Sequence, residues 1–151
     1  MSFKLSQRSL DNLEGVHEDL ISVAKAAIDI TTVDFAVIEG LRTVEKQKEL
    51  VEKGASQTMN SKHLEGKAID VMAYVDGRGC WELNVYDEIA EAFKLAGSAL
   101  YIPIRWGAAW TVPSILDWSG TMEEAMNSYI DQRRSEGRRP FIDAPHFELL
   151  V

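Results

Sequence analysis

The sequence predicts an α+β fold, in which a small, mainly antiparallel sheet carries helices packed on one side. Two observations predict this class. Four segments have the features of helices, and four short runs of strand-forming residues lie among them. The last run, at residues 143–151, alternates between two faces, one of them apolar, as expected of a strand that joins the sheet.

The first half of the chain contains two of the predicted helices. Residues 9–28 carry apolar residues at helical spacing and are predicted to form one helix. His17 lies within it beside acidic neighbours, and we interpret it as a solvated helix residue. A strand is predicted at residues 35–39. Thr43 is suited to cap the next helix, residues 44–53, which Gly54 ends.

The second half supplies the remaining elements. Residues 67–74 are predicted to form a strand that follows Gly66, and Asp76-Gly77 is a turn signal. Further along the chain, we expect a helix at 84–100 and a strand at 102–106. The last helix is expected at 121–136, with acidic residues at its start and arginines near its end, as the helix dipole favours.

Composition limits the class of protein. The chain has 151 residues, enough for one domain that buries roughly 70% of its unfolded surface. Its net charge of −8 argues against nucleic-acid binding and against an anionic-lipid anchor. No apolar run has the length of a membrane span or a signal peptide. Cys80 is the only cysteine, which excludes a disulfide framework and a cysteine-based zinc site.

Residues 61–70, Ser-Lys-His-Leu-Glu-Gly-Lys-Ala-Ile-Asp, offer the first fragment of a metal site. His63 lies in a loop, and Asp70 lies seven residues later on the predicted strand. Gly66 between them allows a sharp turn, so the imidazole and the carboxylate can converge. A catalytic zinc site usually has three protein ligands and a water, so a third ligand must come from elsewhere in the chain.

The C-terminal strand offers the best third ligand. The sequence contains three histidines, and His146 shares a strand face with Glu148. Asp143, three residues before His146, is suited to be the base beside a metal-bound water. Glu148 is a second acidic candidate, either for that base or for fixing a ligand imidazole.

These patterns resemble a known group of enzymes. The motif Ser-x-His-x-x-Gly-x-Ala-x-Asp at 61–70, followed by Asp-x-x-His at 143–146, is similar to that of the zinc peptidases of the D-alanyl-D-alanine carboxypeptidase and dipeptidase group. The chain is most similar to one branch, the phage endolysins that cleave the L-alanyl-D-glutamate bond of peptidoglycan. Further matching residues are 1–4, 39–43, 95–97 and 104–110.

The resemblance implies a function and a site. It implies one catalytic zinc held by His63, Asp70 and His146, on the open face of the sheet, with Asp143 as general base. Arg42 is expected to contact a substrate carbonyl or carboxylate instead of forming only a surface ion pair. Ser61 is expected to contact the substrate or to support a ligand, and Glu148 to fix an imidazole.

The two tryptophans and the basic run have two interpretations each. Trp106 and Trp110 either pack in the core or form a wall of the cleft, where we expect Trp106 to bind substrate. Arg133–Arg139 is either a solvated helix end or a contact with the anionic wall polymer. One departure is Ala109, where several relatives carry Asp, so any orienting role of that Asp falls to another group here.

Three functions remain open from the sequence. They are the endopeptidase, a D-alanyl-D-alanine carboxypeptidase or dipeptidase on the same scaffold, and a non-catalytic domain that keeps a zinc. The resemblance favours a monomeric endolysin that acts on peptidoglycan stem peptides as a single catalytic domain at 1–151, with no separate wall-binding domain. We expect it to be made in the host cytoplasm without a signal peptide, and released to the wall by a membrane-perforating partner.

Overall fold

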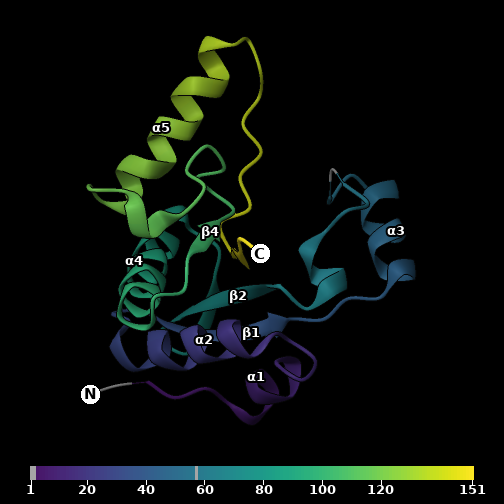
Figure 1. The fold of residues 1–151 in the computed structure, drawn as a ribbon, viewed down its shortest axis with the longest axis vertical. Coiled ribbons are helices and arrows are strands. Elements are labelled where there is room, and N and C mark those ends of the chain that lie inside the picture. The colour runs from purple at the N-terminus through teal and green to yellow at the C-terminus, as the bar shows by residue number, and fades with distance from the viewer. Residues whose placement is uncertain (1–2, 57) are drawn as a thin grey trace.

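A five-stranded antiparallel sheet forms the centre of the protein in the computed structural model, which describes residues 3–56 and 58–151 (Figure 1). Within these residues, the strands are β1 (Asp34–Glu39), β2 (Ala68–Val75), β3 (Arg78–Cys80), β4 (Ile104–Trp106) and β5 (His146–Leu149). Their order is β1-β2-β5-β4, and β3 pairs with β2. The last strand of the chain therefore lies between β2 and β4, and the predicted small antiparallel sheet is confirmed.

Helices cover one face of this sheet. The α-helices are α1 (Gln7–Asn12), α2 (Glu18–Ile30), α3 (Val44–Glu52), α4 (Leu83–Leu100) and α5 (Met122–Ser135). Two short 3₁₀ helices, η1 (Lys62–Glu65) and η2 (Ile115–Asp117), complete the elements of the described residues. Helix α4 packs on the sheet and α2 packs on α4. No helix in residues 3–56 and 58–151 has both the length and the apolar character needed to cross a membrane.

The register of β2 and β5 separates an apolar face from a polar one. Ile69 lies opposite Phe147, and Asp70 lies opposite His146. Because successive side chains on a strand alternate, the first pair points into the core and the second points away from it. The Phe147 ring stacks on Phe93 of α4, with centroids 4.0 Å apart. The polar face remains open, so the sheet presents Asp70 and His146 side by side.

Helices α3 and α5 do not cover the sheet in the same way. In Figure 1 they project from the body on opposite sides of β5. The polar face of the sheet lies between them, so each of these helices is placed to form a wall beside that face.

The single helix predicted at residues 9–28 is wrong, because the chain forms α1 and α2 with a break between them. Gly15 adopts a left-handed conformation with φ of +83°. His17 then caps α2, accepting a hydrogen bond at Nδ1 from the Asp19 amide over 3.1 Å. A glycine and an N-cap turn the chain while the apolar spacing continues, so periodicity alone does not reveal the break.

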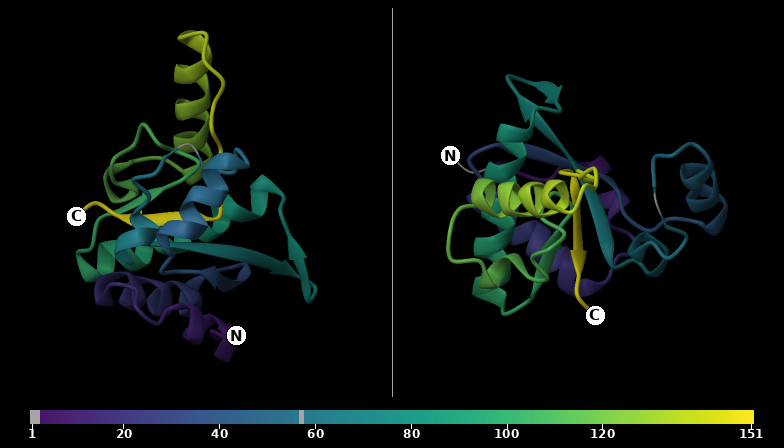
Figure 2. Two further views of the ribbon diagram at one scale, coloured as in Figure 1. Left: turned by 90° about the vertical axis from the view of Figure 1, so that its right-hand side faces the viewer. Right: turned by 90° about the horizontal axis from the view of Figure 1, so that it is seen from above.

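Strand β3 was missing from the prediction. Asp76 and Gly77 have φ of +54° and +76°, as a tight hairpin requires, and the predicted turn is confirmed. The three residues after it, with a glycine at their centre, give too weak a pattern to predict a strand. Both views in Figure 2 show this hairpin extending beyond the rest of the sheet.

Candidate metal centre and cleft

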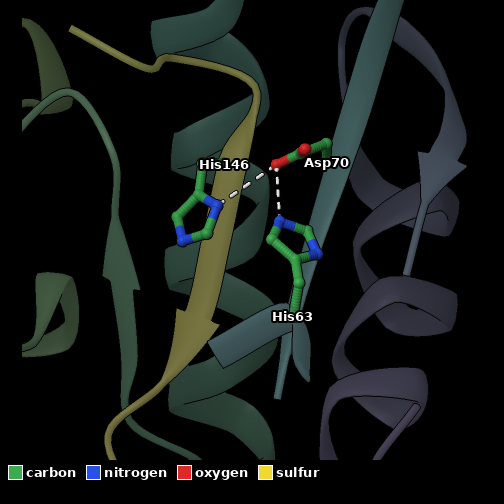
Figure 3. Close-up of side chains that lie close together, drawn as sticks. All are labelled: His63, Asp70 and His146. Carbon is green, nitrogen blue, oxygen red and sulfur yellow. Dashed lines mark hydrogen bonds and ion pairs between the residues drawn. The ribbon is translucent and has the colours of Figure 1, made fainter. Parts of the chain in front are cut away.

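Three side chains from different elements meet on the polar face of the sheet. His63 comes from η1, Asp70 from β2 and His146 from β5 (Figure 3). Asp70 Oδ1 lies 3.2 Å from His63 Nε2 and 3.2 Å from His146 Nδ1. One donor atom from each residue lies within 4.8 Å of the others, the spacing of ligands around one metal ion. The structure therefore brings together the three residues predicted to bind metal.

His63 is positioned by main-chain contacts. Ser61 caps η1 and accepts a hydrogen bond from the His63 amide over 3.2 Å. The His63 ring places Nδ1 2.8 Å from the carbonyl oxygen of Gly40. A carbonyl can only accept, so Nδ1 carries the hydrogen and the lone pair of Nε2 faces Asp70. The contact between Nδ1 and Gly40 thus leaves Nε2 as the nitrogen available to a metal.

Gly66 ends η1 and allows His63 to approach β2. Its φ of +70° lies in the left-handed region. A Cβ at this position would lie 2.4 Å from the carbonyl oxygen of Gly15, so the two backbones pack directly. The amide of His17 donates to the Gly66 carbonyl over 2.8 Å, which ties this turn to the start of α2. The glycine is therefore required by both its conformation and its surroundings.

His146 is positioned by a side chain instead. Glu148, two residues further along β5, shares its strand face, and Glu148 Oε1 lies 2.7 Å from His146 Nε2. Lys62 lies 3.7 Å from the other oxygen of Glu148. The carboxylate accepts from Nε2, so Nδ1 is the nitrogen that faces Asp70. Glu148 lies against the ring of a candidate ligand and is separated from the metal position by that ring.

The charges around the three residues favour a cation at their centre. Burial opposes ionisation of Asp70, but its close contacts with the His146 and His63 imidazoles outweigh it and hold its pKa well below the usual range. Burial also opposes the charged form of His146, yet Asp70 and Glu148 raise its pKa to about 10. Three carboxylates, counting Asp143, surround two imidazoles, so the donor set fits a divalent metal ion.

Asp143 lies beside this centre and is less constrained. Its Oδ2 is 3.9 Å from His146 Nδ1, and its side chain is 37% exposed. Burial, together with the nearby charge of Asp70, raises the pKa of Asp143 to about 6. Its backbone is fixed, because its amide donates to Gly107 over 2.8 Å and its carbonyl accepts from the His146 amide over 3.0 Å. The position suits a group that exchanges protons.

Arg42 reaches the centre from the junction of β1 and α3. Its guanidinium donates to Glu39 over 2.7 Å, to Gln47 over 2.6 Å and to Asp70 Oδ2 over 3.4 Å. The side chain is only 7% exposed. Arg42 therefore supports the Asp70 carboxylate as well as lining the cleft.

An open cleft of about 700 Å³ lies over the metal centre. One wall comes from α3 and the segment that follows it, and includes Leu50, Ala55, Ser56, Thr58 and Asn60. The opposite wall comes from α5 and the segment that follows it, and includes Tyr129, Gln132, Arg133, Glu136, Arg138 and Phe141. Ser61 and Asp143 also line the cleft. A peptide lying between the walls would pass directly over the three candidate ligands.

The prediction that Trp106 contacts substrate is wrong, because its side chain is fully buried. Trp106 lies opposite Phe147 on the core face of the sheet and donates from Nε1 to the Ala144 carbonyl over 2.8 Å. Trp110 lines the cleft, with its ring 5.5 Å from that of His146. Of the two interpretations given to these tryptophans, core packing applies to Trp106 and a cleft wall applies to Trp110.

Arg105 is a cleft residue that sequence reasoning missed. Arg105 lies opposite Glu148 in the register of β4 and β5. Its guanidinium lies 5.2 Å from the Trp110 ring centroid and donates to the Trp110 carbonyl. Ala109, where several relatives carry Asp, is fully buried. The second ring nitrogens of His63 and His146 contact Gly40 and Glu148, so both imidazoles are oriented without an acidic residue at position 109.

The open antiparallel sheet and the His-Asp-His group beneath a cleft define a hydrolase-like site that can hold a metal ion. The chain belongs to the phage L-alanyl-D-glutamate peptidase family, whose model matches residues 1–150. The resemblance stated from the motifs is thereby confirmed, and the protein is a peptidase of this family.

Individual relatives agree with this assignment. The chain is 35% identical over 114 residues to the L-alanyl-D-glutamate peptidase of Escherichia phage T5, covering 73% of this chain and 83% of that protein. It is 29% identical over 107 residues to the L-alanyl-D-glutamate peptidase of Listeria phage A118, covering 69% of this chain and 37% of that one. The crystal structure of the Serratia marcescens L-Ala D-Glu endopeptidase ChiX matches with a TM-score of 0.72 at 34% identity, over 98% of this chain and 90% of that one.

Proposed function

We propose that this protein is a phage endolysin that hydrolyses the L-alanyl-D-glutamate bond of peptidoglycan stem peptides with one zinc ion. The observation that carries the proposal is the meeting of His63, Asp70 and His146 beneath a cleft in a member of the L-alanyl-D-glutamate peptidase family. The cell wall is then its site of action. Release by a membrane-perforating partner, a monomeric state and a single catalytic domain at 1–151 belong to the same proposal.

Zinc is proposed because of the chemistry of the donors. Two imidazole nitrogens and one carboxylate oxygen suit zinc, with a fourth position for water or substrate. When bound, zinc supplies a Lewis acid that polarises the scissile carbonyl and lowers the pKa of a water molecule. His63 Nε2, Asp70 Oδ1 and His146 Nδ1 are the atoms that would hold it.

The residues around the centre have separate proposed tasks. Asp143 takes a proton from the attacking water and delivers it to the leaving nitrogen as the peptide bond breaks. Arg42 holds Asp70 in place and presents its guanidinium to a substrate oxygen. Glu148 fixes the tautomer of His146. Ser61 supports the turn that carries His63 and lines the cleft, where Trp110 forms part of the wall.

Mass analysis of fragments from purified peptidoglycan tests the reaction directly. We expect new N-terminal D-glutamate and stems shortened to L-alanine. Release of D-alanine alone would mean the carboxypeptidase, and absence of any cleavage with zinc retained would mean the non-catalytic domain. Either result would overturn the proposal.

Metal analysis tests the proposed ligands. The wild-type protein should hold one zinc per chain after loading, and His63→Ala should lose it. His17→Ala is the matched control, because His17 is an exposed helix cap in α2. Retention of one equivalent of zinc by His63→Ala would place the metal elsewhere.

A further inference from the structure

The two walls of the cleft differ in charge. The wall formed by α3 and the segment after it presents apolar and neutral polar residues, among them Leu50, Ser56 and Asn60. The wall formed by α5 and the segment after it presents Arg133 and Arg138 with one acidic residue, Glu136. The chain as a whole carries a net charge of −8, so a basic wall is a local feature. It suits an anionic part of a substrate.

Most basic side chains in the described part of the cleft are bound to the protein itself. Arg42 donates to Glu39, Gln47 and Asp70. Lys62 donates to the Leu149 carbonyl and lies near Glu148, and Arg105 donates to Trp110. Arg133 gives two nitrogens to the Arg139 carbonyl and lies over the Tyr129 ring at 5.8 Å. These contacts hold Lys62, Arg105 and Arg133 against the protein, and they hold Arg42 at the candidate metal centre, where its contact with substrate is already proposed.

Arg138 differs from the other cleft cations. The ion pair that the structure gives its guanidinium is a 3.9 Å contact with Glu136, and its side chain is 59% exposed. Its backbone is held, because its amide donates to the Arg133 carbonyl over 2.8 Å at the end of α5. A fixed backbone with an exposed guanidinium on a cleft wall is suited to bind a carboxylate.

The position of Asp143 shows which part of the substrate meets this wall. Under the proposed function, Asp143 protonates the leaving nitrogen, so the product that begins with D-glutamate lies on the Asp143 side of the centre. From there the segment between Asp143 and α5 runs up that wall, as the yellow trace in Figure 1 shows. Arg138 lies five positions before Asp143 in the chain, which limits the separation of their Cα atoms to about 17 Å.

We propose that Arg138 binds a carboxylate of the stem peptide beyond the D-glutamyl residue and so selects stems that are anionic there. This rests on the proposed function, because it uses the direction of the leaving group. The upper limit of about 17 Å corresponds to a few extended residues, so a contact with Arg138 falls within the rest of the stem, at the third residue or at the C-terminal carboxylate. A third residue that is a diamino dicarboxylic acid offers such a group, and lysine does not.

Synthetic stems test the proposal. The first pair is L-Ala–D-Glu–X–D-Ala amide, with X as diaminopimelate or lysine, and the second pair compares a free with an amidated C-terminus on the lysine stem. In one of the two pairs, we expect the wild-type enzyme to cleave the stem with the extra carboxylate faster. A preference in the first pair identifies the third residue as the group bound by Arg138, and a preference in the second pair identifies the C-terminal carboxylate. Because Arg138 is exposed, the preference should be about 3- to 5-fold in kcat/KM, expressed mainly in KM.

Variants assign the preference to Arg138. Arg138→Gln should reduce the preference to near unity, and Arg134→Gln, on the exposed end of α5 outside the cleft, should keep it. Glu136→Gln removes the competing carboxylate and should increase the preference, a gain that misfolding cannot produce. An unchanged preference in Arg138→Gln, or an equal loss in Arg134→Gln at the same ionic strength, would overturn this role. If wild-type enzyme cleaves none of the stems, the proposed function itself fails.

Discussion

The two halves of the candidate metal centre are built differently. The half that precedes α4 contains Arg42, His63 and Asp70, and the polar atoms of these side chains contact Glu39, Gln47, Gly40 and one another. The half that follows α5 contains Asp143, His146 and Glu148, where Asp143 is 37% exposed while His63 on the other side is 1% exposed. In the first half, each of the three side chains is held in place by neighbouring protein groups. The second half holds His146 in the same way but leaves the Asp143 carboxylate accessible.

This difference between the two halves predicts two kinds of mutational effect. Changes at His63 and Asp70 should act through the metal or the fold, because their polar atoms contact only each other and neighbouring protein groups. Changes at Asp143 should act through proton transfer, because its carboxylate faces the cleft. The following variants test that division, from the largest expected effect to the smallest.

The largest effect is expected for Asp143→Asn. Asparagine keeps the size of the side chain but cannot accept the proton, and removal of a general base typically costs about 10²- to 10⁴-fold in kcat. Zinc content and thermal melting should stay close to those of the wild type, measured by metal analysis and calorimetry. Loss of zinc would make Asp143 a ligand. Retained lytic activity would transfer the role of base to another residue, and Glu148, behind the His146 ring, is not placed for it.

Arg42→Ala should weaken the first half. It removes the donor to Asp70 and any contact with substrate, and loss of a group that orients a ligand typically costs about 10- to 100-fold in metal affinity or activity. Zinc titration against a competing chelator and kcat/KM on peptidoglycan separate the two contributions. If kcat/KM falls while zinc affinity is unchanged, Arg42 serves the substrate alone. If both are unchanged, it has neither role.

Glu148→Gln tests the corresponding contact in the second half. Glutamine keeps an oxygen that can accept from His146 Nε2 but removes the negative charge, so we expect a loss of zinc affinity near the lower end of the range of about 10- to 100-fold. The same chelator competition measures it. A loss of kcat with zinc affinity unchanged would contradict a purely orienting role.

The smallest and most local test compares two glycines. Gly66 and Gly54 both have left-handed backbones, with φ of +70° and +74°. At Gly54 nothing lies within 4 Å of an added Cβ, and at Gly66 the Gly15 carbonyl lies 2.4 Å away. Gly54→Ala should cost about 1 kcal/mol in the free energy of unfolding, from the left-handed conformation alone. Gly66→Ala should cost more in the same denaturant titration, and an equal cost would mean that the backbone contact adjusts freely.

Residues within one strand or one short turn were the easiest part of the site to predict. His63, Asp70 and His146 follow from a turn glycine and from the alternation of side chains along two strands. The motif resemblance then selected them from the other titratable residues. The fold class was predictable for the same reason, because helical and strand periodicities are local properties.

Features that depend on the register between distant strands were not predictable. Trp106 is buried because β4 aligns it with Phe147, and the same register places Arg105 opposite Glu148. The sequence of β4, which has only three residues, is too short to predict either alignment. The projection of α5 is a similar case. Its apolar stripe indicates that one face is buried, but not that the far end of the helix forms a cleft wall.

The place of β5 in the sheet has a consequence for the order in which the protein forms. Strands β2 and β4 are synthesised before β5, yet each is joined to the other only through it. Asp70 and its partner His146 are separated by 76 residues, so closing this loop carries an entropic cost that the inserted strand must repay. A nascent chain that has not reached residue 146 lacks both the strand and a candidate ligand. We therefore expect it to be unable to cleave peptide bonds, so that activity begins only after β5 has been synthesised and has paired with β2.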